Sequence, residues 1–136
     1  MIAQGFALHR QLQADTFLIA DWALSRVLLN DDARFPWLIL VPRRPALCEL
    51  HDLSHAERMV LIEEMARAGK NLKAITQAAK INTAALGNQV PQLHVHIVAR
   101  HPGDAAWPGA VWGSGAAVPY AEETCQSLLD SLQKGL

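Results

Sequence analysis

The strongest structural signal in the sequence is one long amphipathic helix, which lies between two groups of strand-like segments. Ser54 and Glu57 have the spacing of a capping box, in which a hydroxyl and a carboxylate each bind a backbone amide at the helix start. The apolar residues that follow recur at four-three spacing, so that one stripe of the helix faces a core: Leu61, Met65, Ala68, Leu72 and Ile75. We expect this helix to run from Ser54 to about Lys80.

Short apolar runs bounded by turn residues predict strands on both sides of this helix. The expected strands cover 16–20, 23–30 and 37–42 before the helix, and 81–88 and 92–100 after it. A short last helix is expected over 120–133, with Pro119 at its first turn and one apolar face: Cys125, Leu128, Leu129 and Leu132. Because strands and helices are grouped and do not alternate regularly, the pattern predicts the α+β class.

Residues 101–119 are rich in glycine and proline, with four of the eight glycines and three of the seven prolines of the chain, and they include Trp107 and Trp112. Exposing two tryptophans in a flexible segment is costly, so we expect an ordered loop. It either folds back on its own core, or forms a subunit contact or a lid near a functional site, since tryptophan is favoured at interfaces.

The composition narrows the class of protein. A chain of 136 residues with 51% apolar and 18% charged residues is typical of one globular domain, here 1–136. Its 12 basic and 13 acidic residues nearly cancel, which argues against a nucleic-acid polymer or a membrane surface as partner. No apolar run approaches the ~20 residues of a membrane span.

The two cysteines, Cys48 and Cys125, have no metal-binding C-x-x-C spacing. The N-terminus carries no secretory leader, so we expect free thiols in a reducing, cytoplasmic compartment.

The most informative short segment is QLHVHIV (92–98), in which two histidines stand two residues apart. On a strand, Gln92, His94 and His96 would share one face, and the apolar residues between them would face a core. Three interpretations are open: hydrogen-bonded histidines on a half-exposed sheet, a pair of zinc ligands that still needs a third ligand, or nucleophilic catalysis on phosphorus by an imidazole.

The surrounding sequence favours the catalytic interpretation. LGNQVPQLHVHIVAR (86–100) resembles the signature of the histidine triad (HIT) superfamily, in which a Gly-Gln-x-Val-x segment leads into His-x-His-x-His. Gly87 and Val90 match the glycine and the valine of that signature. His94 falls on its central histidine and His96 on its last histidine.

A second segment, VPRRPALCELHDLS (41–54), is similar to the one that joins the third strand to the long helix in that family. The resemblance, clearest over 37–100, implies an antiparallel sheet of about five strands with one long helix and a short C-terminal helix. It also implies a homodimer, a nucleotide substrate and no tightly bound cofactor, except for a divalent cation that accompanies the substrate phosphates.

The resemblance further implies a covalent mechanism. His94 would attack the α-phosphorus of a nucleotide conjugate, with its far ring nitrogen held by a backbone carbonyl. His96 would donate to the phosphate or assist the leaving group. Gln89 and Asn82 would be further phosphate contacts, which stabilise developing charge.

The chain also departs from the family pattern at two places. Gln92 stands where the first histidine of the motif is found, and Trp37 where many members carry another active-site histidine. We expect the two family positions to be neighbours in space. By the same resemblance Asn30 is the expected ribose contact, although a solvated turn fits it equally. Arg100 would meet a phosphate tail or be an exposed surface arginine.

The family resemblance therefore leaves two possible functions, and a zinc site remains as a third interpretation. One is an active hydrolase that cleaves a phosphoanhydride or phosphoramidate bond, with a leaving-group preference altered by Gln92 and Trp37. The other is a nucleotide-binding module with little or no turnover. We favour the hydrolase because His94, the expected nucleophile, is retained.

Overall fold

The protein is described here by a computed structural model of residues 5–136, so the first four residues of the expected domain lie outside the described residues. Its strands form one antiparallel sheet in the order β1-β2-β3-β5-β4. The strands are β1 (Thr16–Asp21), β2 (Ser25–Asn30), β3 (Trp37–Pro42), β4 (Lys80–Ala84) and β5 (Val95–Arg100). The helices are α1 (Arg10–Asp15), α2 (His55–Thr76) and α3 (Glu122–Gly135), with a 3₁₀ turn η1 (Leu50–Asp52).

This architecture confirms the predicted α+β class and the expected antiparallel sheet of five strands with one long helix and a short C-terminal helix. The predicted ends of the last two strands are wrong, because β4 stops at Ala84 and β5 starts only at Val95. Gly87, between them, has a φ of 83°, a left-handed conformation that leaves the extended backbone of a strand. Gln92 and His94 therefore lie in a connecting segment and not on a strand.

The long helix α2 begins as predicted. The hydroxyl of Ser54 accepts from the Glu57 amide, and the Glu57 carboxylate accepts from the Ser54 amide. The helix ends at Thr76, earlier than the predicted Lys80, because Gln77 adopts a left-handed φ of 54° and its amide donates to the Lys73 carbonyl. The predicted apolar stripe packs in the core, with Leu61, Ala68 and Leu72 buried.

One polar side chain of α2 is also buried. The carboxylate of Glu64 accepts from the backbone amides of Leu24 and Ser25, both at 3.0 Å. These amides lie where β1 turns into β2, so the carboxylate binds that turn to the helix.

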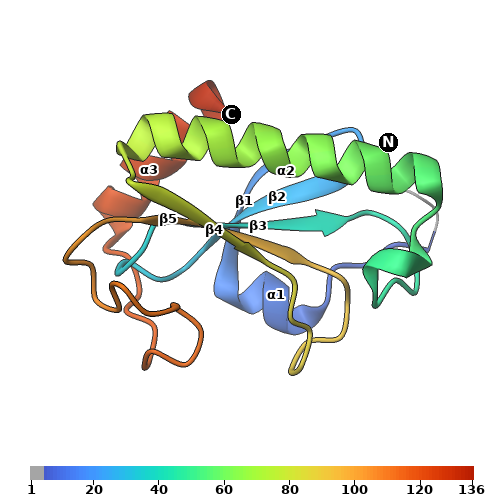
Figure 1. Ribbon diagram of the computed structural model, residues 1–136, viewed down its shortest axis with the longest axis horizontal. Coiled ribbons are helices and arrows are strands. Elements are labelled where there is room, and N and C mark those ends of the chain that lie inside the picture. Colours follow the sequence, from blue (N-terminus) through green and yellow to red (C-terminus); the bar gives the residue numbers. More distant parts are fainter. Residues whose placement is uncertain (1–4) are drawn as a thin grey trace.

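The sheet has two differently covered faces (Figure 1). The helix α2 lies across one face, while α1 lies on the opposite face. Leu93, Val95 and Ile97 pack in the core on the α2 side, as predicted. The opposite face carries a second apolar cluster that contains Trp37, with Ile39, Val41, Val98 and Leu12 of α1. His94 and His96 belong to this second side, because they alternate with the residues that face α2.

The C-terminal helix α3 starts later than predicted. Its N-cap is Ala121, so Pro119 precedes the helix and does not occupy its first turn. Cys125 and Leu132 are buried against the core, as the predicted apolar face requires. Cys125 and the exposed Cys48 are both free thiols. None of the helices in residues 5–136 is long and apolar enough to cross a membrane.

Candidate functional site

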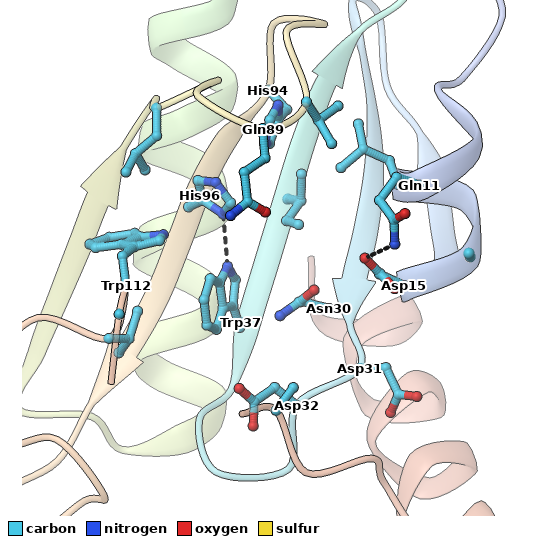
Figure 2. Close-up of a pocket in the computed structure, with 18 of the residues that line it drawn as sticks. Gln11, Asp15, Asn30, Asp31, Asp32, Trp37, Gln89, His94, His96 and Trp112 are labelled. Atoms are coloured by element: carbon cyan, nitrogen blue, oxygen red, sulfur yellow. Dashed lines mark hydrogen bonds between the residues drawn. The ribbon is translucent and has the colours of Figure 1, made fainter. Parts of the chain in front are cut away.

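A cavity of about 600 Å³ opens on the sheet face opposite α2, and His94 and His96 line it. Figure 2 shows the two histidines and Trp37 in a row along β5 and β3, with α1 on one side and Trp112 on the other. The walls come from α1, the end of β2, β3, the β4–β5 connection and the loop after β5: Gln11, Leu12, Asn30, Asp32, Trp37, Gln89, Val90, Val111 and Trp112 are among the lining residues.

His94 is held by its own backbone neighbourhood. It precedes β5, is 7% exposed, and its Nδ1 lies 2.7 Å from the Gln92 carbonyl oxygen. Because a carbonyl only accepts, Nδ1 carries the proton and donates it. With the proton on Nδ1, the lone pair of the uncharged form of the ring is on Nε2, the arrangement that a nucleophilic imidazole needs.

His96 is on β5 and lies beside His94, with the ring centroids 4.8 Å apart. Its Nδ1 is 3.0 Å from the indole Nε1 of Trp37, which donates to it. Burial, together with the neighbouring His94, lowers the pKa of His96 to about 4. The ring is therefore uncharged at neutral pH.

Two further predicted residues line the same cavity. Gln89, in the β4–β5 connection, lines the cavity together with the two histidines (Figure 2). Asn30 lines the cavity at the end of β2. The two acidic residues that follow Asn30 have partners within the protein. Asp31 accepts a hydrogen bond from the Tyr120 amide, and Asp32 forms a salt bridge with Arg34.

The side chain of Gln92 points elsewhere, contrary to its predicted place in a row with the histidines. Its amide nitrogen donates to the Ala7 carbonyl and its amide oxygen accepts from the His9 amide, both at 2.8 Å. Gln92 lines a second hollow of about 230 Å³, which His94 also borders. Gln92 and Trp37 are thus engaged with different partners, the N-terminal segment and His96 respectively.

Arg100 and Asn82 are not brought to the cavity either. Arg100 is only 2% exposed, so it is not a surface arginine. Its guanidinium pairs with the Asp104 carboxylate at 2.8 Å and donates to the Asn82 side-chain oxygen at 2.8 Å. The Asp104 carboxylate also accepts from the His101, Ala106 and Trp107 amides, so the pair closes the turn after β5.

The lining residues of α1 are not predicted from the sequence, whereas Trp112 belongs to the loop that is expected either to fold back on its core or to form a subunit contact or a lid near a functional site. Helix α1 contributes Gln11 and Asp15, but its six residues are too few to show a helical period. Trp112 contacts the rings of both His96 and Trp37, with centroid separations of 5.6 and 6.0 Å. The loop 101–119 thus folds back on its own domain and forms a wall of the cavity, while Trp107 stays partly exposed.

The zinc interpretation needs a third ligand beside the two histidines. Within residues 5–136, no group of three His, Cys, Asp or Glu side chains is placed to hold a metal ion.

Solved structures of known proteins have the same fold over nearly the whole chain. A histidine triad protein from Bradyrhizobium japonicum is 46% identical, with a TM-score of 0.94, covering 96% of this chain and 98% of that one. Histidine triad proteins from Marinobacter aquaeolei VT8 and Sinorhizobium meliloti 1021 are 42% and 41% identical, each with a TM-score of 0.94. They cover 96% of this chain and 96% and 97% of their own.

The family comparison agrees with these structures. No protein of curated function matches the sequence. The model of the HIT domain matches residues 11–103, which include both histidines and most of the cavity wall. The chain therefore belongs to the HIT domain family, that of the histidine triad proteins.

Proposed function

We propose that this protein is a nucleotide hydrolase that cleaves a phosphoanhydride or phosphoramidate bond at the α-phosphate of a nucleotide conjugate, with His94 as nucleophile. The family generally binds nucleotides. The observation that carries the proposal is the state of His94: its Nδ1 donates to the Gln92 carbonyl, which leaves the Nε2 lone pair available at the cavity.

The proposed reaction has two displacements at one phosphorus. Nε2 of His94 attacks the α-phosphorus, and the bond to the leaving group breaks with its electron pair. Water then attacks the same phosphorus and releases the mononucleotide, which regenerates the neutral imidazole. Overall one water is consumed: its hydroxyl goes to phosphorus and its proton to the leaving group. Because the histidine attacks first, one difficult displacement by water is replaced by two easier steps.

The other cavity residues support binding of a nucleotide. The Gln89 amide lines the same cavity as the histidines, where it can donate to phosphate oxygens. Asn30 has a side-chain amide at the cavity wall, suited to ribose hydroxyls. Arg34 also lines the cavity, but its guanidinium is paired with Asp32. The proposed phosphate contacts are therefore His96 and Gln89.

A second candidate function is a nucleotide-binding module with little turnover. It is favoured by one observation, namely that His96 is uncharged at neutral pH and so brings no positive charge to the phosphate.

Turnover separates the two functions. Wild type and His94→Asn are mixed with nucleoside phosphoramidates and dinucleoside polyphosphates, and mononucleotide release is followed. We expect release by wild type and a loss of at least about a thousandfold in the variant. His55→Asn is the matched control, because His55 is exposed and lies at the start of α2. Binding of mononucleotide by both proteins without release from any substrate would support the binding module.

The proposal extends to the setting of the enzyme. We propose a cytoplasmic homodimer whose substrate is a small nucleotide, with a divalent cation that accompanies the substrate phosphates and is not held by the protein alone. The free thiols of Cys48 and Cys125 support a reducing compartment.

A further inference from the structure

Trp37 is placed so that its indole N–H donates a hydrogen bond to the imidazole of His96. In the antiparallel pairing of β3 with β5, Trp37 lies opposite Val98 and Ile39 lies opposite His96. Side chains at these positions share one face of the sheet, so the indole reaches His96 diagonally across the strands. Both side chains are 8% exposed. The hydrogen bond between them therefore has little competition from water.

The chemistry of the two groups decides where the His96 proton sits. An indole N–H is a donor and never an acceptor. Since Trp37 Nε1 lies 3.0 Å from His96 Nδ1, Nδ1 must be the unprotonated nitrogen. The single proton of the neutral ring is then on Nε2. His94 has the opposite arrangement, with the proton on Nδ1 and the lone pair on Nε2.

The surroundings of His96 supply no competing partner. Its ring meets Trp37, Trp112 and His94 edge-on, at interplanar angles of 67°, 69° and 70°. Within residues 5–136, the only hydrogen bond to either ring nitrogen is the one from the indole. The charged groups that line the same cavity, Asp15, Asp31, Asp32 and Arg34, make no bond to the imidazole.

We propose that Trp37 is a positioning residue that holds the His96 proton on Nε2, so that the two histidines present complementary nitrogens: a lone pair on His94 and an N–H on His96. The role of that N–H as a phosphate donor rests on the proposed function, whereas the tautomer does not. Trp37, which stands where the resemblance places a histidine in many family members, therefore has a role of its own at His96. It keeps a donor next to His96, one that has no second protonation state.

The tautomer can be measured directly. Protein labelled with ¹⁵N at histidine is studied by two-bond ¹H–¹⁵N imidazole correlation at pH 7, in wild type, Trp37→Phe and Trp112→Phe. Wild-type His96 is expected as a neutral ring protonated on Nε2, with Nδ1 shifted as a hydrogen-bonded acceptor. Trp37→Phe keeps the aromatic ring but removes the donor, so Nδ1 is expected to move to the position of a free acceptor or to gain a proton in part of the molecules.

Trp112→Phe is the matched control, since Trp112 contacts the same imidazole at 5.6 Å but makes no hydrogen bond to it. We expect the Nδ1 signal of His96 to stay unchanged in this variant. A wild-type His96 that carries its proton on Nδ1 would overturn the proposal, even if Trp37→Phe fails to fold. An Nδ1 signal that is identical in wild type and folded Trp37→Phe would also overturn it.

Turnover is a separate readout in the same proteins. If wild type releases mononucleotide, Trp37→Phe is expected to lower kcat about tenfold, the effect of about one lost hydrogen bond at the transition state, with mononucleotide affinity retained. If wild type releases none while the tautomer follows the indole as described, the proposed hydrolase fails and the positioning role of Trp37 stands.

Discussion

Gln92 offers a sharp test of the structure, because it stands in the histidine motif of the family and yet binds the N-terminal segment. Its side-chain amide pairs with the backbone of that segment, donating to Ala7 and accepting from His9. The segment leads directly into α1, whose residues Gln11 and Asp15 line the cavity. Replacing Gln92 by alanine removes both hydrogen bonds and therefore loosens a wall of the site.

The size of the effect follows from the two bonds. Each is 2.8 Å long, and a typical hydrogen bond contributes about 0.5–1.5 kcal/mol to stability. One of the pair is exposed and belongs at the lower end, so we expect Gln92→Ala to lower the stability of this attachment by about 1.5–2 kcal/mol. That corresponds to a fall of roughly 10- to 30-fold in the exchange protection of the His9 amide.

Hydrogen exchange at single residues is the assay, with mononucleotide affinity measured on the same samples. Gln13→Ala is the matched control, because Gln13 is an exposed glutamine of α1 whose side chain makes no hydrogen bond to the described residues. We expect faster exchange at His9 and weaker binding in Gln92→Ala only. Equal exchange at His9 in wild type and Gln92→Ala would show that the amide does not hold this segment.

Three further predictions concern buried polar groups. Arg100→Met leaves the Asp104 carboxylate buried without its partner and is expected to cost about 3–5 kcal/mol in urea unfolding, whereas a loss below about 1 kcal/mol would contradict the buried pair. The hydrogen bond from Arg100 holds the pKa of Asp104 well below its ordinary value of 3.8. The contribution of this carboxylate to the free energy of unfolding is therefore complete above that pH and is lost as the pH falls below it. The stability difference between wild type and Asp104→Asn should narrow between pH 5 and pH 2, as followed by thermal unfolding. Glu64→Ala strands the amides of Leu24 and Ser25 and is expected to lower the free energy of unfolding by about 2–4 kcal/mol, with Glu64→Gln, which keeps one acceptor, losing less by the same measurement.

The features that the sequence predicts well are those with local causes. The start of α2 depends on Ser54 and Glu57, three residues apart, and its buried stripe depends on the helical period. The alternation of residues along β5 likewise predicts which side chains face α2. The family signature places His94 and His96 together, and the structure lines one cavity with both.

The features that the sequence does not predict depend on partners far away along the chain. The amide of Gln92 binds residues that precede it by 83 and 85 positions, and nothing in the local sequence names them. Trp37 reaches a histidine 59 residues away. Arg100 is expected from the sequence to meet a phosphate or to be exposed, because a buried arginine is rare, and the carboxylate that allows its burial lies in a loop with no regular pattern.

The position of β5 inside the sheet has a consequence for synthesis of the chain. β3 is buried along all six of its residues, and it lies between β2 and β5. On the ribosome β2 is available at once, but β5 is made only after α2 and β4. Until then one edge of the most apolar strand has no partner, and such an edge is prone to pair with other chains. We therefore expect the nascent protein to be most prone to aggregation between translation of β3 and of β5, the strand that carries His96.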